Sequence, residues 1–241
     1  MKEINAGDNF RHEFKYFVNE HQIALLKSRL SAVMTPDPHC VQNKSYFIRS
    51  LYFDDMNHSS YFDVFAGVDN REKFRVRLYN HDDGKISLEK KCKIHGMTYK
   101  QAAHLSKSQA EMLIARKVPD FLRADPLLRE LCLAVLSRGM HPSVIVDYDR
   151  YAFISPLGNV RITFDTNISA SVGNADIFDR DILRVPLLPK GQHILEVKYD
   201  EFIPDVISSL LSVDGELTPT AFSKYVLAKS AQNSFGLKTV I

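Results

Sequence analysis

Charged side chains recur at every second position in six segments of this chain, where they alternate with largely apolar residues. Successive side chains of a β-strand point to opposite faces, so residues two apart share a face. One face of the predicted strands therefore carries ten cations: Arg11, Lys15, Lys73, Arg75, Arg77, Lys91, Lys93, Arg150, Arg161 and Lys198. The same face carries four anions, Glu13, Glu89, Asp165 and Glu196.

This excess of positive charge points to a polyanionic ligand. For any single strand, a charged face in water is the simpler interpretation. A solvated face, however, usually mixes the signs of its charges to limit repulsion. Two cations about 6 Å apart repel by roughly 3 kcal/mol at an effective dielectric near 20, so clustering them costs stability unless an anion lies between them. We infer that the face binds a ligand with several phosphates.

The four carboxylates indicate a metal site, because a carboxylate repels phosphate unless a divalent cation joins the two. Glu196 is the best single candidate, since it lies in the middle of a predicted strand, with Glu13 and Glu89 as weaker ones. A salt bridge to a neighbouring lysine or arginine is an equally good interpretation of Glu196. The nine histidines show no spacing typical of a metal site, and no glycine-rich phosphate loop, Gly-x-Ser-x-Gly or Cys-x-x-Cys motif is present.

The elements that must position these side chains follow from apolar periodicity and from capping and turn residues. Strands are predicted over residues 10–18, 46–54, 71–79, 86–93, 143–154, 159–165 and 192–199, with a hairpin turn at 81–84. One helix is predicted from an Asn19 cap, with Gln22 completing a capping box, as far as Pro36. Further helices are predicted from a Ser108–Glu111 capping box, from Asp125 to Gly139, over 204–213 and over 221–234.

The pattern as a whole favours one α+β domain over residues 1–241, built on a large antiparallel sheet. If the sheet closes into a barrel with its charged face inward, the cations surround a ligand and helices cover the apolar outer face. Leu127, Leu128, Leu131 and Leu133 suit such packing. Ser223 and Lys224 fall at the start of the last predicted helix, where backbone amides favour anions. For Lys224 alone, a solvated surface lysine is the simpler interpretation.

Composition sets the remaining limits. With 241 residues, 45% apolar and 25% charged, the chain has the makeup of a folded protein, and its net charge of +2 decides nothing about nucleic acid. Apolar runs are too short for a membrane segment, and the first residues do not resemble a secretory signal. Three widely spaced cysteines are typical of a reduced compartment, so a cytoplasmic location is expected. An inward cationic face with few interleaved aromatics argues against nucleic-acid binding.

Eight short segments, taken in order, resemble the VTC-type polyphosphate polymerase domain, a branch of the CYTH or triphosphate tunnel metalloenzyme superfamily. The segments are Arg11–Tyr16, Ser50–Asp54, Lys73–Arg77, Glu89–Lys91, Asp149–Phe153, Val160–Ile162, Leu195–Lys198 and Phe222–Tyr225. The resemblance covers nearly the whole chain. It departs at the first strand, where the superfamily carries Glu-x-Glu-x-Lys and this chain has Arg11 in place of the first glutamate. That loss of a carboxylate favours the polymerase branch over two-metal hydrolases.

The resemblance implies an antiparallel β-barrel tunnel, with the terminal helices outside, that moves the γ-phosphate of ATP onto inorganic polyphosphate with Mn2+ or Mg2+. It implies catalytic contacts to phosphate from Lys15, Arg75, Arg77, Lys91, Arg150, Arg161 and Lys224. Supporting contacts to the substrate are expected from Lys73, Lys93, Lys100, Lys198, Ser223 and Tyr148, and metal contacts from Glu196, Glu13 and Glu89.

The chemistry expected of such a site needs no general base, because the attacking oxygen of a terminal phosphate is already ionised. Two alternatives stay open. A hydrolase of the same fold would split tripolyphosphate or nucleoside triphosphates, and a binding module would hold polyphosphate without turnover. The sequence does not decide whether Tyr52, Tyr148 or another residue recognises the base of the nucleotide.

Overall fold

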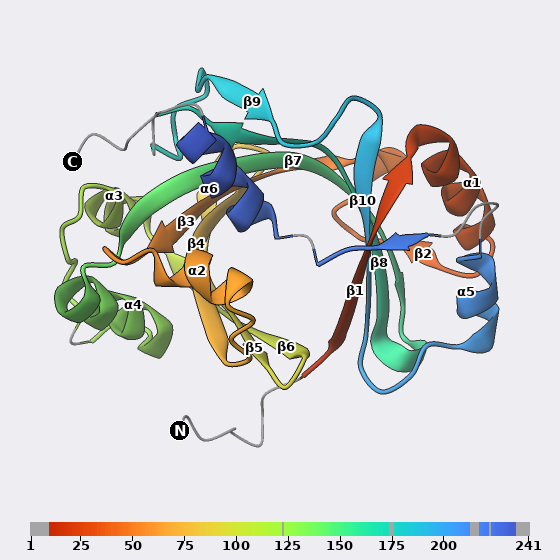
Figure 1. The fold of residues 1–241 in the computed structure, drawn as a ribbon, viewed down its shortest axis with the longest axis horizontal. Helices are drawn as coiled ribbons and strands as arrows, with labels where there is room; N and C mark the ends of the chain where they lie inside the picture. Colours follow the sequence, from red (N-terminus) through yellow and green to blue (C-terminus); the bar gives the residue numbers. More distant parts are fainter. Residues whose placement is uncertain (1–9, 122, 174–175, 213–216, 222, 235–241) are drawn as a thin grey trace.

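A computed structural model describes residues 10–121, 123–173, 176–212, 217–221 and 223–234 (Figure 1). Its strands are β1 (His12–Asn19), β2 (Thr35–Pro36), β3 (Tyr46–Asp54), β4 (Arg71–Tyr79), β5 (Asp82–Ile94), β6 (Met97–Leu105), β7 (His141–Ser155), β8 (Val160–Ser171), β9 (Arg184–Pro186), β10 (Gln192–Tyr199) and β11 (Thr218–Pro219). Its α-helices are α1 (Glu20–Leu30), α2 (Ser59–Phe65), α3 (Lys107–Ile114), α4 (Pro126–Arg138), α5 (Asp205–Leu210) and α6 (Lys224–Ser234). Short 3-10 turns are η1 (Val41–Asn43) and η2 (Leu157–Asn159).

The strands of the described residues form one antiparallel sheet that curls into a tunnel. Their order is β11-β1-β10-β8-β7-β3-β4-β5-β6, with β2 beside β7 and β9 beside β8. In Figure 1, β7 arches over the top while β1 and β6 approach each other below. There Arg11 and Thr98 exchange two backbone hydrogen bonds, of 2.9 and 3.1 Å. The predicted α+β tunnel is therefore confirmed, although a single bridge, not a continuous ladder, joins its two edges.

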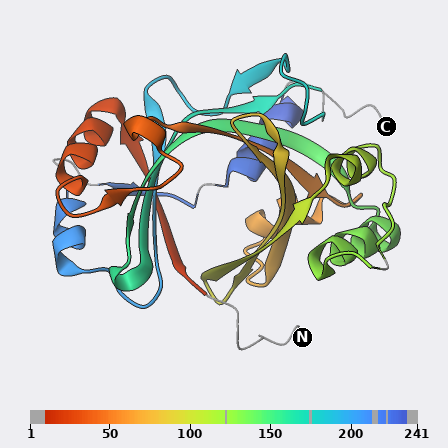
Figure 2. The same cartoon turned by 180° about the vertical axis from the view of Figure 1, so that it is seen from behind.

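The outer face of the curled sheet carries the hydrophobic core. On β4 the even-numbered residues Phe74, Val76 and Leu78 are at most 2% exposed and pack with residues of α3 and α4. A second cluster packs α1 against β8 and β10. Figures 1 and 2 show α3 and α4 at one side of the sheet and α1 and α5 at the other. The apolar residues that alternate with the charged ones thus face the helices, as predicted.

The last helix departs from the expectation that helices lie outside. Lys224 and Tyr225, in the first turn of α6, line the cavity within the sheet, together with Ser223 just before the helix. Tyr225 is 1% exposed, and its hydroxyl donates a hydrogen bond to the Asp54 carboxylate. This helix therefore contributes side chains to the site that the sheet encloses.

Side-chain caps account for the starts of α1, α3 and α4. Asn19 and Gln22 form the predicted capping box of α1, and α4 begins after Asp125 and ends at Gly139, whose φ is 64°. The predicted extension of α1 to Pro36 is wrong, because the helix ends at Leu30 and a turn leads into β2.

The cap predicted for the third helix is also wrong. Ser106 and Gln109 form the capping box of α3, two residues earlier than the predicted pair Ser108 and Glu111. Both pairs satisfy the same sequence signature. The end of β6 at Leu105 decides between them, since the chain must turn as soon as the strand stops.

The β4–β5 hairpin is confirmed, but its turn is tighter than predicted. Tyr79 pairs with Asp82, so Asn80 and His81 form a two-residue turn with φ of 51° and 57°. The Asn80 side chain accepts a hydrogen bond of 2.9 Å from the Phe47 amide, which holds the turn against β3.

Two outward side chains differ from the sequence interpretation, and the short strands β2, β9 and β11 and helix α2 were not predicted. Leu133 and Phe14, assigned to apolar packing, are 51% and 46% exposed. Strand β6 follows β5 along its whole length and was not predicted. Within the described residues, no helix is both long and apolar enough to cross a bilayer.

Candidate functional site: a cationic cavity inside the curled sheet

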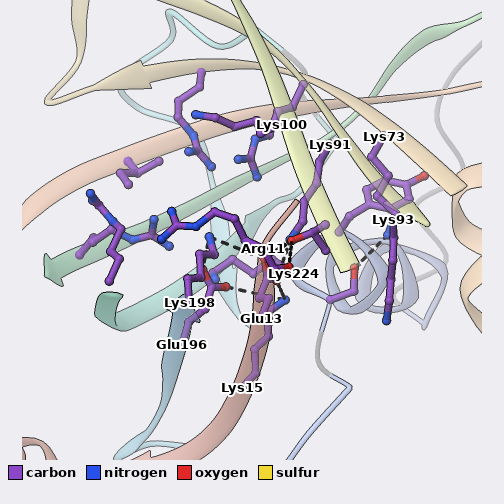
Figure 3. Close-up of a pocket in the computed structure, with 18 of the residues that line it drawn as sticks. Arg11, Glu13, Lys15, Lys73, Lys91, Lys93, Lys100, Glu196, Lys198 and Lys224 are labelled. Atoms are coloured by element: carbon purple, nitrogen blue, oxygen red, sulfur yellow. Dashed lines mark hydrogen bonds and ion pairs between the residues drawn. The ribbon is translucent and has the colours of Figure 1, made fainter. Parts of the chain in front are cut away.

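The concave side of the sheet encloses a cavity of about 660 Å³. Its wall contains every predicted site residue except Glu89: Glu13, Lys15, Lys73, Arg75, Arg77, Lys91, Lys93, Lys100, Tyr148, Arg150, Arg161, Glu196, Lys198, Ser223 and Lys224. Figure 3 shows many of these side chains converging from different strands. Residues that lie far apart in the sequence therefore meet in one cavity, most of them from the predicted charged face of the strands and Lys100, Ser223 and Lys224 from outside it.

Strand β4 provides the clearest row of inward side chains. Its odd-numbered positions, Arg71, Lys73, Arg75, Arg77 and Tyr79, all line the cavity. Because alternate residues of a strand are about 7 Å apart, this row extends over roughly 27 Å. Four successive cations followed by one aromatic ring suit an extended anion with an aromatic group at one end.

Glu89 lies in the wall behind these cations, 1% exposed at its side chain. Its carboxylate accepts hydrogen bonds of 2.5 Å from Arg75 Nη2 and 3.0 Å from Lys100 Nζ, and Arg77 Nη1 lies 3.4 Å away. Burial opposes ionisation of Glu89, but Arg77, Arg75 and Lys100 lower its pKa well below the usual value. Glu89 therefore stays ionised and fixes three cations. It does not line the cavity, whereas Glu13 and Glu196, the other two glutamates predicted as metal ligands, do.

Asp165 plays the same part on β8. It accepts hydrogen bonds of 2.6 Å from Arg150 Nε and 2.6 Å from Lys224 Nζ and is fully buried. Although burial raises its pKa, Arg150 and Lys224 lower that pKa to about 2. The carboxylate thus joins β7, β8 and α6, and it explains how the predicted lysine of the last helix reaches the cavity.

Glu13 on β1 and Glu196 on β10 form the acidic part of the cavity, shown in Figure 3 among three lysines. Lys91 Nζ lies 2.6 Å from Glu13, Lys198 Nζ lies 2.6 Å from Glu196, and Lys15 Nζ lies 3.0 Å from Glu13 and 3.8 Å from Glu196. Burial raises the pKa of both carboxyls, but these lysines hold it well below the usual value. Both glutamates therefore carry a negative charge into the cavity.

These two carboxylates fit a divalent cation that arrives with a phosphate ligand. Among the described residues, no group of three or more His, Cys, Asp or Glu side chains is arranged to hold a metal by itself. Mg2+ is commonly bound by one or two carboxylates together with substrate phosphates and water. Glu13 and Glu196 supply such an incomplete set of oxygen ligands.

Tyrosine hydroxyls hold the arginines of the wall. Tyr52 accepts a hydrogen bond of 3.1 Å from Arg75 Nη1, and Tyr148 accepts one of 3.0 Å from Arg77 Nη2. Tyr46 accepts one of 3.1 Å from Arg161 Nη2. The guanidinium groups are thus fixed in place before any ligand binds, which lowers the entropy cost of binding.

Three lining cations differ from the rest. In the part of the chain that the structure describes, no carboxylate pairs with Arg71, Lys73 or Lys93. Lys73 Nζ instead donates a hydrogen bond of 3.1 Å to Ser223 Oγ. Burial and the charges of Lys15 and Lys91 lower the pKa of Lys73 to about 7. An anionic ligand would therefore favour the charged form of Lys73, as it would that of Lys91, whose pKa burial also lowers to about 7.

Some lining residues escaped the sequence analysis. Arg71 lies two residues before Lys73 and therefore on the same face of β4, so the alternation of charged residues also indicates it. Asp37 and His39 lie between β2 and η1, where no periodicity identifies them. Asp37 is buried, and it holds the pocket residue Arg161 through an ion pair of 2.5 Å.

Comparisons with known proteins identify the family of the chain. The sequence profile of the VTC domain matches residues 10–231. Vacuolar transporter chaperone complex subunit 4 of Schizosaccharomyces pombe is 26% identical over 273 positions, which cover 90% of this chain and 36% of that protein. The chain therefore spans about a third of the length of this relative.

The matches among solved structures have low sequence identity. A Bacillus halodurans protein, provisionally described as an adenylate cyclase, has a TM-score of 0.48 at 10% identity, covering 98% of this chain and 94% of that chain. A chain of the Schizosaccharomyces pombe Mediator head module has a TM-score of 0.44 at 8% identity, covering 83% and 89%.

Proposed function

This chain belongs to the VTC domain family, and we propose that it is a polyphosphate polymerase that transfers the γ-phosphate of ATP to the end of an inorganic polyphosphate chain. The observation that carries the proposal is the convergence of lysines and arginines from seven strands and α6 on one cavity. A nucleoside triphosphate and a phosphate chain are both linear polyanions, so the same row of cations serves donor and acceptor.

The transfer itself requires alignment and charge neutralisation. A terminal oxygen of polyphosphate forms a bond to the γ-phosphorus while the bond to the β,γ-bridging oxygen breaks and ADP leaves. The attacking oxygen is already ionised, so no side chain has to remove a proton. Arg75 and Arg77, each anchored by Glu89 and a tyrosine, are positioned to stabilise the charge that spreads over the phosphate oxygens.

We propose Mn2+ or Mg2+ as the cofactor, held by Glu13 and Glu196. When bound, such an ion neutralises phosphate charge and orients the chain. Lys15, Lys91 and Lys198 keep both glutamates ionised and therefore ready to accept it. A reduced, ATP-containing compartment such as the cytoplasm suits the proposal, and Cys40, Cys92 and Cys132 are all free thiols.

A triphosphate hydrolase is the second candidate. Lys100, whose side chain is 49% exposed, lines the cavity, so water has access to at least part of it. Water in place of the acceptor phosphate would yield orthophosphate. The two activities differ in product and not in the residues that hold the triphosphate.

Product analysis tests the proposal. Purified protein is incubated with ATP and Mn2+, and the products are separated on a gel. We expect a ladder of polyphosphate together with ADP. Orthophosphate and ADP without polymer would favour the hydrolase, and tight binding of polyphosphate without turnover would favour a binding module.

Substitutions in the wall sharpen this test. Arg75→Ala and Lys224→Ala should each lower turnover by roughly 100-fold or more, because each removes a fixed positive charge at the phosphates. Folding should survive, since Glu89 keeps Arg77 and Lys100 in the first variant and Asp165 keeps Arg150 in the second. Lys44→Ala, an exposed lysine outside the cavity, is the control. Unchanged polymerisation in both wall variants would reject the assignment.

A further inference from the structure

Three aromatic side chains meet at one end of the inward row of β4. Tyr79 ends that row, and Tyr46 of β3 and His39 lie against it, with ring centroids 5.6 Å apart for His39 and Tyr46 and 6.0 Å apart for His39 and Tyr79. All three line the cavity. Apart from the Tyr46 hydroxyl, which accepts a hydrogen bond from Arg161, the phosphate contacts and metal ligands of the proposed function do not use this aromatic cluster.

His39 is held rigidly although it is exposed. Its Nδ1 and its backbone amide both lie 2.8 Å from Asp37 Oδ1, and Asp37 in turn pairs with Arg161. The ring is fixed on one side by two tyrosines, yet 67% of the His39 side chain is exposed. A fixed aromatic ring at the edge of a cationic cavity is a surface on which a second flat ring can stack.

The other tyrosines of the cavity lack such a surface. Tyr52, Tyr148 and Tyr225 are 6%, 2% and 1% exposed. The hydroxyls of Tyr52 and Tyr148 hold Arg75 and Arg77, and that of Tyr225 is bonded to Asp54. These three residues are thus structural supports. Tyr99 of β6 also lines the cavity, but it is half-buried and packs against Phe10, with ring centroids 5.0 Å apart, so His39 is the exposed ring beside the arginines of β4.

The order of residues along β4 matches the order of groups in a nucleoside triphosphate. The guanidinium carbon of Arg77 lies 5.9 Å from the Tyr79 ring, and Arg75 and Lys73 follow at steps of about 7 Å. A ligand with a base at the aromatic end would extend its triphosphate past Arg77 and Arg75 toward Lys73. A bare phosphate chain makes no use of the aromatic end.

Resting on the proposed function, we infer that His39 is a nucleotide-binding residue, on whose ring the base of the donor nucleotide stacks, supported by Tyr46 and Tyr79. The contact is to the face of the base, and every base has such a face. The site therefore distinguishes a nucleotide from inorganic triphosphate while discriminating little between ATP and GTP.

Binding without turnover tests this inference separately from the polymerase activity. Dissociation constants of ATP, GTP and tripolyphosphate are measured by calorimetry in EDTA. In His39→Ala, ATP and GTP should bind roughly tenfold more weakly, which is within the range for losing one stacked base, and tripolyphosphate should bind as before. His39→Phe restores a ring without the contact from Nδ1 to Asp37, and it should recover most of the nucleotide affinity.

The controls separate stacking from indirect effects. His104→Ala removes an exposed histidine of the same barrel that does not line the cavity, and it should change nothing. Equal weakening of ATP and tripolyphosphate in His39→Ala would mean that the residue acts through Asp37 and Arg161, which overturns the inference. Unchanged ATP affinity would overturn it as well. If the wild type forms no polymer but these nucleotide effects appear, the proposed function fails and the base site stands.

Discussion

At the scale of single residues, the cavity is stable because its few carboxylates are shared. Glu89 contacts three cations, Asp165 contacts two, and Glu13 and Glu196 divide Lys15, Lys91 and Lys198 between them. Each carboxylate fixes several side chains without cancelling their combined charge. The site is thus organised before binding and still attracts a polyanion.

Glu196→Gln separates metal binding from phosphate binding. The amide keeps the size of the side chain but loses the charge, so the concentration of Mn2+ that gives half-maximal activity should rise at least tenfold. Binding of tripolyphosphate in EDTA should be kept or become tighter, because one repelling charge is gone. Metal titration of activity and calorimetry of the same preparation check both parts. A metal titration that coincides with the wild type would contradict the role given to Glu196.

The lowered pKa of Lys73 predicts that the protein takes up protons when a phosphate chain binds. A pKa of about 7 in the free protein means that this lysine is mostly neutral at pH 8. A bound phosphate chain favours the charged form, so binding at pH 8 should take up about one proton at Lys73 and about one more at Lys91, whose pKa burial also lowers to about 7. Affinity for tripolyphosphate should then be highest below pH 7 and fall as the pH rises above it.

Calorimetry in buffers of different ionisation enthalpy measures this uptake. In Lys73→Met, the uptake should drop by about one proton. Lys44→Met, changed outside the cavity, should behave as the wild type. An uptake that is the same in Lys73→Met as in the wild type would show that another group titrates.

At the scale of the elements, strand parity was the strongest predictor of the site. It placed Lys73, Arg75 and Arg77 on the inside of β4 and Phe74 and Val76 on the outside, because a half-buried strand must divide its residues in this way. The same rule extends to Arg71 and Tyr79. Parity carries no information about loops, which is why Asp37 and His39 could not be predicted.

Strand β6 escaped prediction for a different reason. Its centre contains Lys100, Ala102 and Ala103, which are types that strands disfavour. The strand forms because β5 offers a full ladder along one edge, with registered pairs from Ile86 with Leu105 to Ile94 with Met97. Tertiary pairing thus overrides local preference, and a single sequence does not show it.

The turn between β7 and β8 supplies an element-scale prediction. Gly158 has a φ of 69°, and a Cβ there would collide with the carbonyl oxygen of Phe202. Left-handed backbone alone costs roughly 1–2 kcal/mol for other residues. Gly158→Ala should therefore lower the melting temperature by more than the roughly 2–8 °C that this strain accounts for.

Gly191→Ala is the matched control for this turn. Its φ is 79°, but a Cβ there meets nothing within 4 Å. It should show the backbone strain without the collision, so its melting temperature should lie between those of Gly158→Ala and the wild type. Equal melting temperatures for the two variants would contradict the contact with Phe202.

At the scale of the whole molecule, a nearly closed sheet turns separate charged strands into one internal site. Because β6 and β1 meet through Arg11 and Thr98, cations of β4, β5, β8 and β10 face one another across a cavity of about 660 Å³. The free protein bears the repulsion among them, and a bound phosphate chain relieves it. The family match over residues 10–231 covers all of the strands that build this arrangement.

The most direct measurement of this claim is the melting temperature of the protein as a function of tripolyphosphate concentration. A ligand at 100 times its dissociation constant stabilises the folded state by about 2.7 kcal/mol, which corresponds to a rise of roughly 5–10 °C for a chain of this size. We predict such a rise with tripolyphosphate, and little change with sulfate or duplex DNA at equal ionic strength. No rise with tripolyphosphate, or the same rise with all three anions, would contradict the account.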